Sequence, residues 1–215
     1  MKSMFLTVAG TVLGITLLFA PATSFAKGKM AEHAGMTRIE LRLALRDLWV
    51  EHIFWVRNVA LTTKLGDTDA AKIAEGQVVQ NAKNIANSIS PYYGQQASDK
   101  LFKLLAGHYG AIKDYMTAAY AGNKEAENAA VGKLKENADE IASFLSSANP
   151  NWKKEVLVSA LVTHGEQHIA QINAISSKDY VSEAKTWDAM RKHVYVIADV
   201  LANGIVKQFP KKFAK

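Results

Sequence analysis

The chain contains no cysteine among its 215 residues. This absence excludes disulfide bonds, a lipid anchor attached through cysteine, covalently attached c-type haem, an iron–sulfur cluster held by thiolates, and catalysis by cysteine. Proline is also scarce, with four residues in the whole sequence. Because proline interrupts helices, its scarcity leaves long segments free to form continuous helices.

Several motifs that carry chemistry are also missing. No stretch shows the sustained apolar–polar alternation of a half-buried strand, and no glycine-rich loop of a P-loop or dinucleotide-binding type occurs. The net charge of +6 is spread along the chain apart from the lysines at its C-terminal end. A basic stripe with interleaved aromatic residues is absent, so we expect no nucleic-acid partner.

Residues 1–26 have the pattern of a cleaved signal peptide. Lys2 gives a positive start, residues 4–20 form an apolar run, and Ser24-Phe25-Ala26 fits a small-x-small cleavage site. A retained membrane anchor is the alternative, but the run is at the short limit for a bilayer span. We therefore expect export to the periplasm or beyond, and a single domain over residues 27–215. No transmembrane segment is expected in this mature chain.

Three histidines, His52, His108 and His164, are evenly spaced along the sequence. Other residues share this spacing without gaps: Leu45, Leu101 and Leu157; Ile85, Ile141 and Ile197; Asp67, Asn123 and Asp179. Self-similarity at a fixed period indicates tandem copies of one structural unit. The sequence therefore predicts three units of equal length, at about 38–93, 94–150 and 151–208.

Each unit has the pattern of two long helices joined by a tight turn. Apolar residues recur at helical spacing, and each turn combines a glycine or lysine with an Asp or Asn: Gly66-Asp67, Gly122-Asn123 and Lys178-Asp179. Glycine ends helices in a left-handed conformation, and Asp or Asn caps the next helix. Because the third turn lacks glycine, we expect its geometry to differ. We expect Pro91, Pro150 and Pro210 to end the second helices.

The predicted fold class is therefore all-α, a bundle of about six long helices formed by three antiparallel α-hairpins. A short turn makes the two helices of a unit antiparallel neighbours. The sequence leaves open whether the hairpins close around an axis or stack in a row. Closure would bring His52, His108 and His164 together, whereas stacking would leave each with its own partner.

The spacing also predicts a polar layer halfway along the bundle. His52 precedes Gly66 by the same number of residues as Asn81 follows Asp67. Equal distances from a turn place two residues at one height in an antiparallel hairpin. The same relation holds for His108 with Asn137 and for His164 with His193. Since the three evenly spaced histidines fall on the apolar faces of their helices, we expect this layer to cross the core.

One interpretation of the layer is a metal or ligand site. Histidine is the commonest metal ligand among side chains, and helical bundles hold metals in their interiors. His164 and His168 lie one turn apart on one helical face, and His193 and Glu166 could complete a shell for zinc or copper. The candidate residues are His52, His108, His164, His168, His193, Glu51 and Glu166, with Asn81 and Asn137 supporting them.

The other interpretation is structural. A neutral imidazole and an asparagine amide can satisfy each other's hydrogen bonds, and such pairs fix the register of long helices. The metal motifs are also weak: no Glu-x-x-His occurs, and His164-Gly-Glu-Gln-His168 differs from the zinc-protease pattern.

We expect the arginines of the first helix (Arg42, Arg46 and Arg57) to form solvated pairs with neighbours such as Asp47.

Three stretches, Leu48-Trp49-Val50-Glu51-His52, Asn137-Ala138-Asp139-Glu140-Ile141-Ala142 and Gly204-Ile205-Val206-Lys207-Gln208-Phe209-Pro210, carry a family resemblance. With them, nearly the whole mature chain resembles an uncharacterised family of exported bacterial helical proteins. Members often carry labels such as acetylglutamate kinase or glycosyltransferase. Those enzymes are α/β proteins with glycine-rich loops, which this sequence lacks. The resemblance implies a helical exported protein and no role for any particular residue.

Three functions follow as hypotheses. The leading one is an exported, non-enzymatic helical bundle whose histidine layer binds a small ligand or a divalent metal such as zinc or copper. The second is an interaction or scaffold protein of the cell envelope, since repeated helical hairpins form partner surfaces. The third is an enzyme that uses histidine as a general base or metal ligand, which requires a cleft that reaches the layer.

Overall fold

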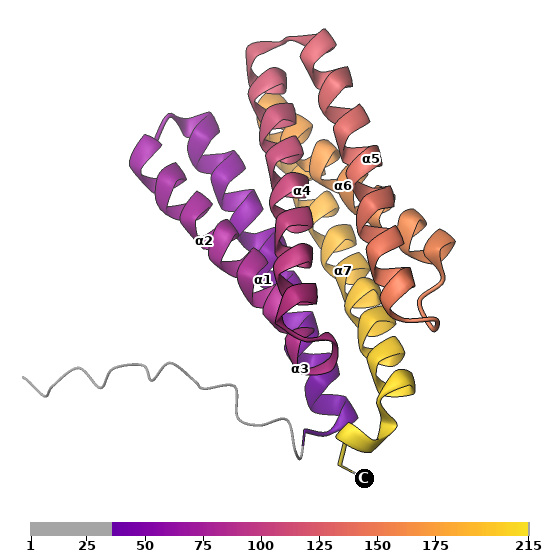
Figure 1. Ribbon diagram of the computed structural model, residues 1–215. Coiled ribbons are helices and arrows are strands. Elements are labelled where there is room, and N and C mark those ends of the chain that lie inside the picture. Colours follow the sequence, from indigo (N-terminus) through magenta and orange to yellow (C-terminus); the bar gives the residue numbers. More distant parts are fainter. Residues whose placement is uncertain (1–35, 215) are drawn as a thin grey trace, which may run out of the picture. The chain divides into compact units, whose positions relative to one another are not determined.

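The computed structural model describes residues 36–214. The predicted signal peptide, residues 1–26, lies outside this range, so export remains a prediction. Within residues 36–214 the chain is helical and contains no strand, which confirms the all-α prediction (Figure 1). Its six long helices are α1 (Arg38–Leu65), α2 (Thr68–Asn87), α4 (Gln95–Ala121), α5 (Lys124–Ala148), α6 (Lys154–Ser177) and α7 (Tyr180–Gln208). A short helix α3 (Ser90–Tyr93) and a 3₁₀ turn η1 (Pro210–Lys212) complete the described elements.

The helix ends follow the capping residues of the sequence. Thr37 and Glu40 form a reciprocal capping box that starts α1. At the start of α2, α5 and α7, the side chains of Asp67, Asn123 and Asp179 accept hydrogen bonds of 3.0, 3.1 and 3.0 Å from backbone N–H groups three residues later. These caps satisfy N–H groups that the first turn of a helix leaves without partners, and they fix where each second helix begins.

The turn between α6 and α7 has the same geometry as the other two. Lys178 has φ 61° and ψ 24°, and Gly122 has φ 70° and ψ 22°. The N–H of Asp179 bonds to the carbonyl of Ala174, as that of Asn123 bonds to Ala118. The expectation that the third turn differs was therefore wrong. Its backbone hydrogen bonds and cap hold a lysine in the left-handed region that glycine occupies more easily.

The prolines act differently at the three linkers. α5 and α7 end two residues before Pro150 and Pro210, as expected when proline disfavours a helical residue before it. In contrast, α2 already ends at Asn87, and Pro91 lies in the first turn of the separate helix α3. The prediction that Pro91 ends the second helix was wrong, because proline is tolerated in a first turn, where its missing N–H has no partner to lose.

The helices pack as neighbouring pairs that close around a common interior. α1 packs on α2, α4 on α5 and α6 on α7, and Figure 1 shows the first two of these pairs lying side by side. Further contacts join α1 to α7 and α6, α2 to α4, and α6 to α4 and α5. The helix pairs therefore close rather than stack in a row. That the pairs are copies of one repeating unit stays a prediction.

The core consists of two apolar clusters that meet midway along the helices. The first contains Trp49 and Ile53 of α1 and Leu161 of α6, and the second contains Val56 of α1 and Ile172 of α6. The polar layer lies where they meet, since His52, His164 and His168 fall between these residues along α1 and α6. Between residues 36 and 214, no helix combines the length and apolar character needed to cross a membrane.

Candidate metal centre

Four histidines from three helices converge at the junction of the two apolar clusters. His52 comes from α1, His108 from α4, and His164 and His168 from α6, and their exposed fractions are 7, 4, 1 and 0%. The ring centroid of His164 lies 5.5 Å from that of His52, 5.8 Å from that of His108 and 4.5 Å from that of His168. Closure of the helix pairs has thus brought the rings of His52 and His108, together with that of His168, around the ring of His164.

Three of these side chains are arranged as ligands of one ion would be. His52, His164 and His168 each offer a ring nitrogen, and these three nitrogens lie within 4.8 Å of one another. The Nε2 atoms of His164 and His168 are 3.1 Å apart. Two nitrogens at about 2.0–2.1 Å from a zinc ion and about 100° apart have this separation. The same distance also fits a hydrogen bond between two imidazoles of opposite tautomer.

His108 belongs to the layer but not to this group of three. Its ring stacks on that of His164 with an interplanar angle of 15°. Both of its ring nitrogens are buried without a hydrogen-bond partner among residues 36–214. A neutral imidazole carries one N–H and one free nitrogen, and the one polar contact of His108 is a weak one with the side chain of Asn137 among residues 36–214.

Burial keeps the whole cluster neutral. It lowers the pKa of His52 to about 3, helped by the neighbouring His108. It lowers the pKa of His108 to about 4, an effect that the side chain of Asn137 partly offsets. Burial, followed by repulsion from the other histidines, holds the pKa values of His164 and His168 well below the usual range. The neutral imidazole is the form that binds metals, so no proton has to leave these rings at neutral pH.

Asn81, Asn137 and His193 hold helix pairs together by bonding to the backbone. Asn81 and Asn137 donate through Nδ2 to the carbonyls of Leu48 and Leu104, each at 3.0 Å, and Nε2 of His193 lies 2.8 Å from the carbonyl oxygen of Ala160. Each partner lies 33 residues earlier. As predicted, each of these side chains lies at the height of a histidine on the facing helix. Its hydrogen bond, however, goes to a backbone carbonyl of that helix.

The imidazole–asparagine pairing that the structural interpretation supposed is present only in part, as a weak hydrogen-bond contact between His108 and Asn137. The Oδ1 atoms of Asn81 and Asn137 are buried and accept no hydrogen bond of ordinary geometry within the described part of the chain. The Nδ1 atoms of His52, His164 and His168 are likewise buried and have no hydrogen-bond partner among residues 36–214. The register between paired helices is fixed by Asn81, Asn137 and His193 rather than by His52, His164 and His168.

The two carboxylates predicted for the site lie outside it. Glu166 is exposed on α6, because two residues turn a helix by about 200° and place it opposite His164. Glu51 is half-buried and accepts a hydrogen bond of 3.0 Å from Asn81 Nδ2. Neither carboxylate, and neither His108 nor His193, is part of the group of three histidines.

The structure adds Trp49 to the predicted set. Its indole stands edge-on to His52 and His164, with ring centroids 5.9 and 5.7 Å away. Together with His52, His108 and His164 it lines a narrow cavity of about 10 Å³, whose other walls are mainly apolar. This space is about that of one water molecule. The sequence signal for Trp49 is its place among the aromatic residues near the layer, a pattern that by itself is more typical of core filling.

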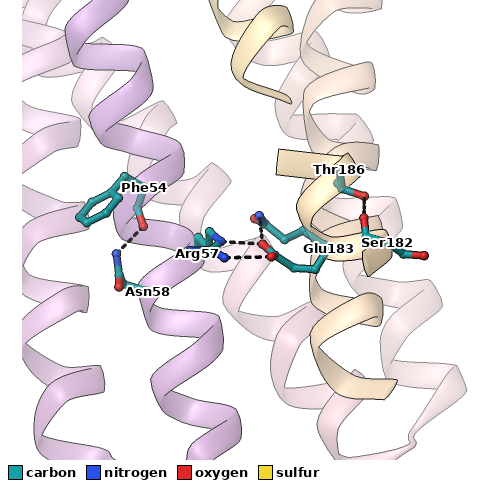
Figure 2. A network of polar contacts seen from close by, with 7 residues as sticks. Phe54, Arg57, Asn58, Ser182, Glu183 and Thr186 are labelled. Carbon is teal, nitrogen blue, oxygen red and sulfur yellow. Dashed lines mark hydrogen bonds and ion pairs between the residues drawn. The ribbon is translucent and has the colours of Figure 1, made fainter. Parts of the chain in front are cut away.

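A second polar group lies farther along the core, beyond His168. Arg57 of α1 donates two hydrogen bonds to Glu183 of α7, one of them at 2.9 Å, and Figure 2 shows this fork. Gln171 of α6 donates to the same carboxylate at 2.9 Å. Likewise Arg46 pairs with Asp199 of α7, and Arg42 bonds to α7 as well. The expectation of pairs with neighbours such as Asp47 was therefore wrong, because α7 packs against this face of α1.

The chain matches no protein-family model, and no curated protein or solved structure is significantly similar to it. The family resemblance drawn from the sequence therefore remains a prediction.

Proposed function

We propose that this chain is an exported, non-enzymatic metal-binding bundle that holds a transition-metal ion between His52, His164 and His168. The observation that carries the proposal is the convergence of three buried imidazoles with nitrogens within 4.8 Å of one another. Imidazole suits zinc, copper, nickel and iron. Export rests on the signal-peptide pattern of residues 1–26.

His168 gives this proposal its strongest support against a purely structural layer. One and two sequence periods earlier the chain has Ile112 and Val56, both buried in the second apolar cluster. The periodic layer therefore needs no histidine at this position. A fully buried imidazole with an unused nitrogen destabilises a core by about 1–3 kcal/mol. Bound metal would offset that cost by using the nitrogen lone pairs of the cluster.

The test is metal binding by chain purified without an affinity tag and freed of metal by a chelator. At a free metal concentration of about 100 times the Kd, binding stabilises the folded state by about 2.7 kcal/mol. For a domain of this size the Tm should then rise by roughly 5–10 °C. Zinc and copper are added separately, copper both as copper(II) and, without oxygen, as copper(I), and the melting transition is followed by circular dichroism.

Two variants separate site binding from binding at other histidines. His168→Ile removes one of the three proposed ligands and installs the residue found at position 112, so it should abolish the rise in Tm. His193→Asn removes a histidine outside the group and installs the residue found at positions 81 and 137, so it should leave the rise intact. If neither metal raises the Tm of the unaltered chain, the proposal fails.

A further inference from the structure

The donor set of this site carries no negative charge. All three proposed ligands are neutral imidazoles, and among residues 36–214 no carboxylate belongs to the group. The buried carboxylate of Glu183 is already held by Arg57 and Gln171. Glu51 is half-buried and bonded to Asn81, and Glu166 is exposed. An ion in this site would therefore keep its full charge.

The surroundings make that charge costly. The cavity beside the histidines is walled largely by apolar side chains, among them Leu105, Ile141 and Leu161. Moving an ion from water into such a medium is strongly unfavourable, and the cost grows with the square of the charge. For ions of similar size, a divalent ion therefore meets about four times the penalty of a monovalent ion.

The number of donors points in the same direction. A structural zinc site is almost always four-coordinate, whereas a catalytic one keeps a water as the fourth ligand. Here three nitrogens lie within reach of one point, and the fourth histidine, His108, stacks on His164 outside the group. Monovalent copper is stable with two or three donors, so the three histidines could complete its coordination without a fourth ligand.

We infer that the site selects copper in its monovalent state over divalent zinc and divalent copper, with His52, His164 and His168 as its ligands. This inference rests on the proposed function and names the ion that fits it. Trp49 then serves as a wall that keeps water from the ion.

The experiment compares the two oxidation states of copper in the same site. Tag-free chain is titrated anaerobically with the acetonitrile complex of copper(I) against a chromophoric copper(I) chelator, and separately with copper(II) and with zinc. The reduction potential of the bound copper is then measured against copper in excess imidazole. Relative to that reference, copper(I) should be favoured at least 100-fold over copper(II), which raises the potential by about 120 mV.

Variants assign the effect to the three ligands. His168→Ile should weaken copper(I) binding at least 100-fold. His108→Leu changes a histidine of the same layer outside the group, and it should leave the copper(I) affinity within about threefold. Trp49 lies 5.7 Å from His164, so copper binding should also quench its emission in both the unaltered chain and His108→Leu.

The outcomes distinguish this inference from the proposed function. If zinc raises the Tm and the bound copper has the potential of the imidazole reference or a lower one, the inference is overturned while metal binding stands. Loss of copper(I) binding in His108→Leu, at unchanged Tm of the metal-free variant, would overturn the three-ligand site in the same way. If none of the ions binds, the proposed function itself is wrong.

Discussion

The helix pair α6–α7 differs from the pairs α1–α2 and α4–α5 in the features that carry chemistry and agrees with them in the features that make the fold. All three pairs have a capped turn, a core histidine and a side chain bonded to a carbonyl 33 residues earlier. Only α6–α7 has a second core histidine, His168, a histidine at the asparagine position, His193, and a lysine in the left-handed turn, Lys178. The features that make the fold are thus shared by all three pairs, and the features that carry chemistry are gathered in α6–α7.

The largest expected effect is loss of stability in acid, because the four buried histidines (His52, His108, His164 and His168) have lowered pKa values in the folded state. The unfolded chain then binds more protons, so stability is complete above about pH 7 and falls below about pH 6.5. The fall continues towards pH 4 and 3, the folded-state pKa values of His108 and His52. Each histidine contributes up to about 1.4 kcal/mol per pH unit.

Urea denaturation of the metal-free chain between pH 8 and 4.5 measures this dependence. Four titrating rings should remove several kcal/mol by pH 5, a large part of the stability of an ordinary domain. His168→Ile and His108→Leu should each lessen the slope by about one proton. A stability that stays flat from pH 7 to 5 would show that the rings are not buried as described.

The next effect concerns the ion pair that ties α7 to α1. Arg57→Met should cost about 3 kcal/mol, because it leaves the carboxylate of Glu183 buried, with a side chain only 4% exposed, and without its cation. The control is Arg46→Met, which breaks the pair with the more exposed Asp199 and should cost less than about 1 kcal/mol. Chemical denaturation at pH 7 measures the free energy of unfolding of both variants. Equal losses would contradict the expectation that the buried pair contributes more to stability than the exposed one.

Much of this fold could be predicted from the sequence because its signals are local. The Asp and Asn caps, the glycines of the first two turns and the apolar stripes each act through neighbours in the chain. The spacing of His52 and Asn81 around their turn also placed the polar layer at the right height. Local geometry should further have excluded Glu166, which lies on the opposite face of α6 from His164.

The remaining features depend on how distant helices meet. No local signal states that the helix pairs close, and only closure brings His52 of α1 against His164 and His168 of α6. The fork between Arg57 and Glu183 likewise joins residues 126 positions apart. The conformation of Lys178 was mispredicted because the hydrogen bonds of the turn outweigh the preference of one residue.

A third prediction concerns a substitution in α6 that installs the residue found at the corresponding position of α4. His168→Ile should stabilise the metal-free chain by about 1–2 kcal/mol, since it replaces a buried polar side chain with an apolar one at a position where Ile112 already packs well. The measurement is urea denaturation at pH 8, where proton uptake is negligible. The reverse change, Ile112→His, should destabilise the chain. A strongly destabilised His168→Ile would show that the imidazole has a structural role and would weaken the metal proposal.

The smallest expected effect makes the third turn resemble the others. Lys178→Gly should stabilise the chain by about 0.5 kcal/mol, because relief of the left-handed strain slightly exceeds the added entropy of the unfolded chain. The matched control is Gly122→Lys, which should destabilise by about 1 kcal/mol for the opposite reason. Thermal denaturation at pH 7 resolves both. A destabilised Lys178→Gly would mean that the lysine side chain contributes to the turn.

The most direct test of the central claim is anomalous scattering from crystals of the chain grown with copper under reducing conditions. We expect one interior peak, about 2.0–2.1 Å from Nε2 of His164, Nε2 of His168 and a ring nitrogen of His52. Copper found only at surface residues, or an interior peak ligated by His108 or His193 in place of one of these three, would contradict the claim.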